Sequence, residues 1–149
     1  MISPGGEGKI KITVDTRKQS AKLTKYISIE SNDPRKRRER LIFQVSVKPW
    51  FKITPSSIVN LTGKFGETKS MDLIISAEVD EPLEIKPRKF SMKGKVSFAL
   101  EEVEKGKQYK ITFKNNPDVI GDFPGYLTLA TNYSKKPVIV IRIHSRFYR

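Results

Sequence analysis

Few residues of this chain have the chemistry that catalysis requires. The sequence contains one histidine, His144, and no cysteine. One chain therefore holds no two-histidine metal site, no disulfide and no thiol nucleophile. The best candidates for general acid and base are the clustered carboxylates Glu101, Glu102 and Glu104. They directly precede Lys105-Gly106, so a charged turn between two strands is the simpler interpretation.

Two further segments contain residues typical of a ligand-binding loop but lack the other residues that such a loop requires. The oxygen-bearing residues Asn115, Asn116, Asp118 and Asp122 have a spacing that fits no calcium loop and suits turns. The segment Gly5–Lys9 has the glycines and lysine of a phosphate-binding loop, but no Ser or Thr follows the lysine and no helix is expected after it. We therefore predict no catalytic residue, no metal ligand and no cofactor.

The charge of the chain points to anionic partners. Its 149 residues include 29 lysines and arginines against 16 aspartates and glutamates, a net charge of +13. Such a balance favours nucleic acid or another polyanion as a partner, although a solvated hairpin tip is the favoured interpretation of the densest run, because the second copy keeps only two lysines there. No apolar run approaches the roughly 20 residues of a membrane span. The candidate anion-binding residues are Arg35, Lys36, Arg37, Arg38, Arg40, Lys135 and Lys136.

The elements that would position these side chains are β-strands. Apolar residues alternate with polar ones along short segments, no window keeps helical spacing, and nine prolines and nine glycines separate the segments. This pattern predicts an all-β sandwich. Asn60-Leu-Thr and Asn132-Tyr-Ser match a glycosylation acceptor pattern and fit ordinary turns. The predicted strands include residues 9–15, 23–29, 41–47, 51–55, 71–79, 83–87, 90–92, 95–100 and 108–113.

An internal repeat defines the domains. The segment Leu23–Val45 is an edited copy of Phe123–Ile143, and Gly8–Val14 is similar to Lys107–Phe113. About 50 residues of strand-like sequence precede the second copy, whereas the first copy begins almost at its match. We therefore expect residues 1–49 to form the C-terminal half of a first module, with three strands, and residues 50–149 to form a complete second module.

The half-module would leave an apolar face in water, which costs roughly 25 cal/mol per Å². Either the natural chain starts upstream of Met1, or a second chain covers the exposed edge by strand pairing. We expect the partner to be another protein or a second copy of this chain.

Three aromatic residues are candidates for interaction. Trp50 marks the junction of the copies, where we expect it to be wedged; an exposed binding tryptophan is the alternative. Tyr26 and Tyr126 occupy the same position in the two copies, on the face opposite their aliphatic neighbours. They are either platforms for stacking bases or sugars, or structural residues whose hydroxyls bond to the backbone at a sandwich corner. Repetition in both copies favours the structural role.

These segments resemble a known family. The stretches 4–16 and 22–34, and more loosely 121–132, are similar to a bacterial family of domains of unknown function. Its fold is immunoglobulin-like, of the major-sperm-protein and Hydin (ASH) type. The resemblance implies an antiparallel sandwich of seven to eight strands, tandem modules, frequent export to the periplasm or cell envelope, and no known catalysis. Bacterial members often carry a Cys-Gly-Cys stretch ahead of the Pro-Gly segment, which this chain lacks, and residues 1–15 show no signal-peptide pattern.

The function we expect is that of a non-catalytic structural or protein-interaction module from a tandem immunoglobulin-like protein of the bacterial envelope. The alternative is a binder of anionic polymer, nucleic acid or envelope polyanion, acting through the basic hairpin loop.

Overall fold

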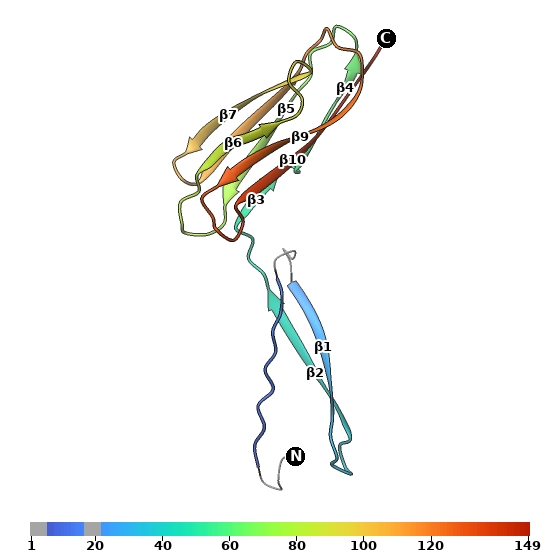
Figure 1. Ribbon diagram of the computed structural model, residues 1–149, viewed down its shortest axis with the longest axis vertical. Coiled ribbons are helices and arrows are strands. Elements are labelled where there is room, and N and C mark those ends of the chain that lie inside the picture. The colour runs from blue at the N-terminus through green and yellow to red at the C-terminus, as the bar shows by residue number, and fades with distance from the viewer. Residues whose placement is uncertain (1–5, 17–21) are drawn as a thin grey trace. The chain divides into compact units, whose positions relative to one another are not determined.

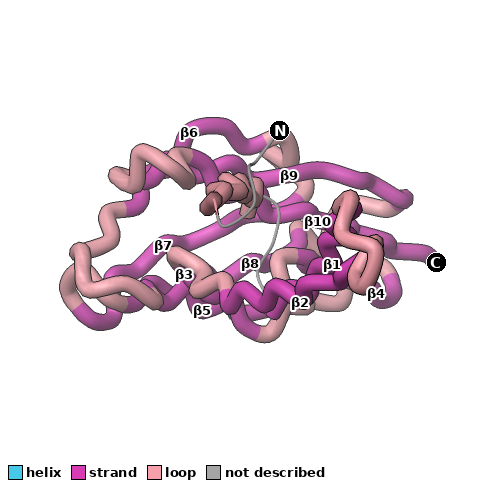
Figure 2. Tube along the Cα trace, turned by 90° about the horizontal axis from the view of Figure 1, so that it is seen from below, coloured by secondary structure: helices cyan, strands magenta, loops and turns pink. Residues whose placement is uncertain are grey.

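The computed structural model describes residues 6–16 and 22–149, which form strands and loops and no helix (Figures 1 and 2). The chain divides into two compact units, Met1–Lys48 and Pro49–Arg149. The second unit is an immunoglobulin-like β-sandwich of mainly antiparallel sheets, as the sequence predicted.

The described part of the first unit contains one hairpin. Strand β1 (Lys22–Glu30) pairs antiparallel with β2 (Arg38–Ser46), in a register that runs from Lys22 opposite Ser46 to Glu30 opposite Arg38. Period-two alternation puts most of the apolar side chains on one face of this hairpin. That face carries Leu23, Ile27, Ile29, Leu41, Phe43 and Val45.

The predicted strand at residues 9–15 is wrong. These residues have no strand structure, and Ile10 and Ile12 are 62% and 42% exposed. Their counterpart in the repeat is β8 (Gln108–Asn115), which lies between β5 (Ser70–Ala77) and β7 (Val96–Glu104) and pairs with both. The described residues of the first unit contain no equivalent of either neighbour, so this alternating sequence has no ladder to join.

The second unit contains two four-stranded sheets. One sheet has the order β3-β5-β8-β7 and begins with β3 (Phe51–Thr54). The other has the order β4-β10-β9-β6, and its strands are β4 (Ile58–Lys64), β6 (Ile85–Phe90), β9 (Gly121–Thr131) and β10 (Val138–Tyr148). Strand β4 runs parallel to β10, whereas all other neighbours are antiparallel.

Alternate residues of both sheets meet in one core. Odd-numbered positions of β10 are buried from Ile139 to Phe147, while the even-numbered ones face outward. This alternation makes one sheet face apolar and leaves the other polar. The large side chains with almost no exposure are Leu61, Leu73, Ile75, Leu83, Met92, Ile111, Phe113, Leu127, Leu129, Tyr133, Ile141 and Ile143.

Most predicted segments differ from the observed strands by a residue or more at their ends, and the larger differences are in β6 and β7. The short pieces 83–87 and 90–92 are replaced by one strand, β6, whose register shifts between Pro87 and Lys89. Strand β7 continues to Glu104, beyond the predicted end at residue 100. Asn60, predicted in a turn, lies inside β4 with its side chain exposed.

Candidate interaction surfaces

The two copies of the repeated hairpin have different surroundings. In the second unit both outer edges of β9–β10 are paired, to β6 and to β4, and the apolar side chains are at most 3% exposed at Leu127, Leu129, Ile139, Ile141 and Ile143. In the first unit β1–β2 is a sheet of two strands, and none of the described residues before Pro49 is buried. Leu41 is 42% exposed. The first hairpin therefore presents an apolar face and two edges without a ladder partner among the described residues.

The five bases at the tip of this hairpin are partly neutralised. Arg38 contacts Glu30 at 2.6 Å and Lys36 contacts Glu39 at 3.3 Å. The Arg40 guanidinium lies 4.1 Å from the centre of the Tyr26 ring. Arg35 and Arg37 form no side-chain ion pair with the described residues and are exposed. The tip therefore remains basic.

Lys135 and Lys136 belong to the other unit. They lie in the turn between β9 and β10, where the Lys136 backbone N–H donates to the Tyr133 carbonyl and the Thr131 hydroxyl donates to the Lys136 carbonyl. Their turn is the counterpart, in the second copy, of the loop 31–37 in the first copy, as the repeat predicts. The two basic tips therefore belong to different units.

Tyr26 and Tyr126 are exposed to different degrees. Tyr26 is 56% exposed and Tyr126 is half-buried. Neither hydroxyl bonds to the backbone of a described residue. The Lys89 ammonium lies 5.5 Å from the centre of the Tyr126 ring, and hydrogen bonding with this tyrosine raises the pKa of Lys89. Both tyrosines thus contact a cation on the outer face of their hairpin.

The structural tyrosines are two that sequence reasoning passed over. The Tyr133 hydroxyl donates to the Glu81 carbonyl at 2.6 Å, and the Tyr109 hydroxyl lies 3.0 Å from the Leu83 carbonyl. Burial raises the pKa of both phenols. Among the described residues, the hydroxyl–backbone bonds expected of Tyr26 and Tyr126 are thus formed by Tyr109 and Tyr133 instead.

Trp50 is part of the second unit. Its ring centre lies 5.3 Å from that of Tyr133, and its carbonyl accepts the Glu78 N–H. The side chain is half-buried against the core. That it is wedged between the modules stays a prediction.

The acidic cluster has structural partners. Glu102 accepts hydrogen bonds from the Gly106 N–H at 2.8 Å and from the Tyr109 hydroxyl at 3.0 Å, and these bonds hold its pKa below the ordinary value. Glu104 pairs with Lys107 at 2.9 Å. These contacts link the end of β7 to the turn and the start of β8, and so stabilise this hairpin.

The proposed oxygen ligands of a cation also serve the fold. The buried Asn115 amide accepts the Lys69 N–H at 2.6 Å and donates to the Glu67 carbonyl at 2.9 Å. Asn116 bonds its own turn by accepting the Asp118 N–H. Across residues 6–16 and 22–149, no three His, Cys, Asp or Glu side chains gather in a metal-binding group.

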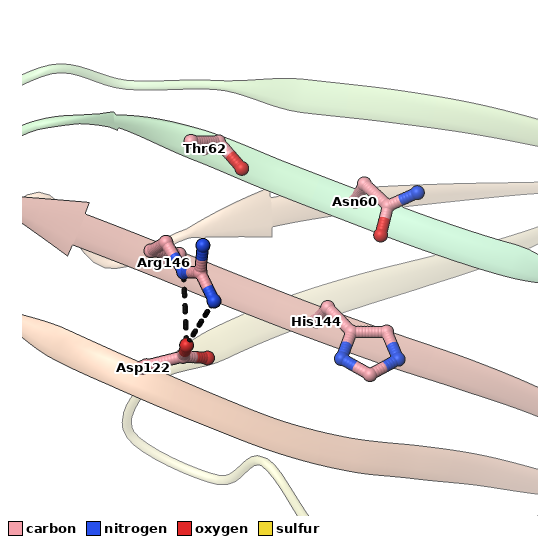
Figure 3. Close-up of a pocket in the computed structure, with 5 residues that line it drawn as sticks. All are labelled: Asn60, Thr62, Asp122, His144 and Arg146. Atoms are coloured by element: carbon pink, nitrogen blue, oxygen red, sulfur yellow. Dashed lines mark hydrogen bonds and ion pairs between the residues drawn. The ribbon is translucent and has the colours of Figure 1, made fainter.

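A polar hollow of about 390 Å³ lies on the outer face of the sheet β4-β10-β9-β6. Figure 3 shows its lining from three neighbouring strands. Arg146 donates from Nε at 2.8 Å and from one terminal nitrogen at 2.6 Å to the same oxygen of Asp122. Alternation along β10 was a signal that His144 and Arg146 share a face, but the β4 contribution was not visible in the sequence. The lining residues are Asn60, Thr62, Asp122, His144 and Arg146.

No helix in the described part of the chain is long and apolar enough to cross a membrane. Comparison with protein-family models gave no match, and a search of curated proteins gave none either. The resemblance noted from the sequence stays a prediction.

Proposed function

We propose that this chain is a non-catalytic protein-interaction module whose first unit is completed by β-structure from a partner polypeptide. The observation that carries this proposal is the contrast between the two hairpins. The apolar face of β9–β10 is covered by the sheet β3-β5-β8-β7, whereas the apolar face of β1–β2 has no covering sheet among the described residues.

The energetics favour a partner. A two-stranded hairpin alone is marginally stable in water, and burying its apolar side chains yields roughly 25 cal/mol per Å². The pairing of β4 and β6 with the outer edges of β10 and β9 indicates the partner's chemistry: extended segments that add to the edges, with alternate apolar side chains. An immunoglobulin-like module of a tandem envelope protein, or a second copy of this chain, has this chemistry.

Amide hydrogen exchange of the full chain tests the proposal. In dilute monomer we expect rapid exchange in β1 and β2 and slow exchange in β9 and β10, because only the second hairpin is held in a sandwich. If the pure chain supplies the partner, exchange in β1–β2 slows as its concentration rises. Phe43→Asp on the apolar face should block that slowing, whereas Thr24→Asp on the polar face should not.

Equal protection of the two hairpins in dilute monomer would contradict the proposal, because it would mean that β1–β2 needs no partner. Rapid exchange at every concentration would instead exclude a second copy and leave a different polypeptide as the occupant.

The basic tip of the first hairpin supports a second function, binding of an anionic polymer. Arg35 and Arg37 are exposed and form no ion pair with the described residues, so they are available to phosphate or another anion. Replacing Arg35, Lys36, Arg37, Arg38 and Arg40 with serine should then abolish binding. Affinity that is unchanged between low and physiological salt would exclude this function, because phosphate contacts release counterions.

A further inference from the structure

The outer face of the sheet β4-β10-β9-β6 is basic. Its only carboxylate in a strand is that of Asp122, which is already bonded to Arg146. The outer face of the other sheet is more balanced, because Asp72 pairs with Lys110 at 3.0 Å and Glu101 lies opposite Lys110 in the ladder. The cations on the outer face of β4-β10-β9-β6 are Lys64, Lys86, Lys89, Arg142 and Arg146.

An aromatic ring lies among these cations. Tyr126 on β9 faces Arg142 directly across the β10 ladder, and Lys89 on β6 lies 5.5 Å from its ring centre. Side chains directly opposite in antiparallel strands are neighbours, with Cβ atoms about 4.5–5.5 Å apart. Arg142 and Lys89 are exposed, and Tyr126 is half-buried. Three adjacent strands thus present a cation, a tyrosine and a cation in a row.

Hydrogen-bonding groups continue the row along β10. His144 lies opposite Asn60 of β4, and Arg146 lies opposite both Thr62 and Asp122. Figure 3 shows the Asn60 and His144 side chains on neighbouring strands, both lining the hollow. The Asp122 carboxylate accepts two hydrogen bonds from the Arg146 guanidinium, and this pair lines the hollow together with the amide and the imidazole.

We propose that this face binds single-stranded nucleic acid. Lys89 and Arg142 contact phosphates, Tyr126 stacks on a base, and Asn60 and His144 bond to base edges in the hollow. Cationic grooves with stacking aromatics are the usual means of binding single strands. The amide and imidazole favour this ligand over an anionic membrane, since a bilayer surface offers them no base edges.

The first unit repeats part of this arrangement. Arg40 lies 4.1 Å from the centre of the Tyr26 ring, on the outer face of the equivalent hairpin. The tyrosine therefore recurs at the same repeat position, and in each copy a cation from a different, non-equivalent position lies beside it. The proposal for the second unit stands on its own contacts and does not depend on strand completion in the first unit.

Fluorescence anisotropy with the full chain and a labelled thymidine oligonucleotide of about 16 nucleotides tests the proposal. Lys89→Gln with Arg142→Gln should weaken binding roughly tenfold at physiological salt and reduce the salt slope by about 1.4, the value for two single-strand phosphate contacts. The matched control is Lys52→Gln with Lys114→Gln, which removes the same charge from the outer face of the opposite sheet. It should leave affinity within about twofold of the wild type, because those lysines would not touch the strand.

Stacking has its own test. Tyr126→Leu should weaken binding by about tenfold, whereas Tyr126→Phe should retain it. An abasic oligonucleotide with the same phosphates should bind less tightly than the thymidine one.

Four outcomes would overturn the proposal. They are equal losses in the two charge-removing pairs, an unchanged affinity in Tyr126→Leu, equal affinity for abasic and thymidine strands, and tighter binding to a sulfated polysaccharide or to anionic vesicles. Equal and substantial losses in the two charge-removing pairs would point to net charge alone. No loss in either pair, together with an unchanged affinity in Tyr126→Leu, would place the contacts elsewhere, for example on Arg35–Arg40. Equal affinity for the abasic strand, or tighter binding to the polysaccharide or the vesicles, would point to a polyanion without bases.

Discussion

Replacing Tyr133 by phenylalanine removes one hydroxyl from the core of the second unit and keeps the ring. The side chain is 1% exposed, its hydroxyl donates to the Glu81 carbonyl at 2.6 Å, and its ring contacts Trp50. Glu81 itself is exposed, so water can bond its carbonyl in the variant. The expected loss is therefore the net value of one hydrogen bond, about 1 kcal/mol, rather than the larger penalty of a buried unsatisfied group.

Alanine at the same position should cost much more. Removing a buried aromatic ring typically costs about 3–5 kcal/mol, and Tyr133→Ala also removes the ring that packs on Trp50. For a unit of this size, the loss of about 1 kcal/mol in Tyr133→Phe corresponds to a fall in Tm of about 4 °C.

Urea unfolding followed by tryptophan fluorescence measures both effects. Trp50 is the single tryptophan of the chain and belongs to the second unit, so its signal reports the unfolding of that unit. Tyr133→Phe at wild-type stability would refute the role assigned to the hydroxyl. A loss as large as that of Tyr133→Ala would show that the hydroxyl, and not the ring, dominates, and would refute the energetic argument.

Three other perturbations test contacts of the second unit. Because the Gly106 N–H and the Tyr109 hydroxyl lower the pKa of Glu102, their stabilising contribution is present at neutral pH and is lost as the pH falls through the folded pKa. The unfolding free energy of Glu102→Gln should therefore decline less steeply in acid than that of the wild type, and parallel curves would count against this contact. Burial raises the pKa of Tyr133, so wild-type stability should fall above about pH 10, where the unfolded phenol ionises; Tyr133→Phe should lose less there, and an equal loss would contradict the assignment. In Gly125→Ala the new methyl would meet the Met92 side chain and the Ser91 hydroxyl, so urea unfolding should show a loss of about 1–3 kcal/mol, and a neutral effect would contradict the observed packing.

Sequence periodicity predicted most of the sandwich because the alternation of apolar and polar residues is visible within each strand separately. Alternation predicted a strand at residues 71–79, and β5 lies there with Leu73 and Ile75 buried. The repeat matched β1–β2 to β9–β10, and both form antiparallel hairpins. Alternation alone was not sufficient where strand pairing decides the outcome. Residues 9–15 alternate as β8 does, yet the described residues of the first unit contain no equivalent of the two strands that pair with β8.

The surfaces were harder to predict because they depend on contacts between distant segments. The polar hollow needs Asn60 of β4 beside His144 of β10, and nothing local to either residue specifies that pairing. Tyr133 was missed because a tyrosine after Asn132 in a polar loop resembles a turn residue, while its burial depends on Glu81 and Trp50. The basic run Arg35–Arg40 was evident from composition, but the partners of its side chains were not.

The parallel pairing of β4 with β10 bears on how the second unit is made. Strand β4 is among the first strands of the unit to leave the ribosome, and its ladder partner is the last. Until β10 has emerged, one edge of β9 is unpaired and the Val59 and Leu61 side chains lack the neighbours that bury them. Such distant pairing slows folding, because a long loop must close before the contacts that stabilise it can form. The nascent unit therefore has a period of aggregation risk, when its strand edges are open, that ends only with the synthesis of β10.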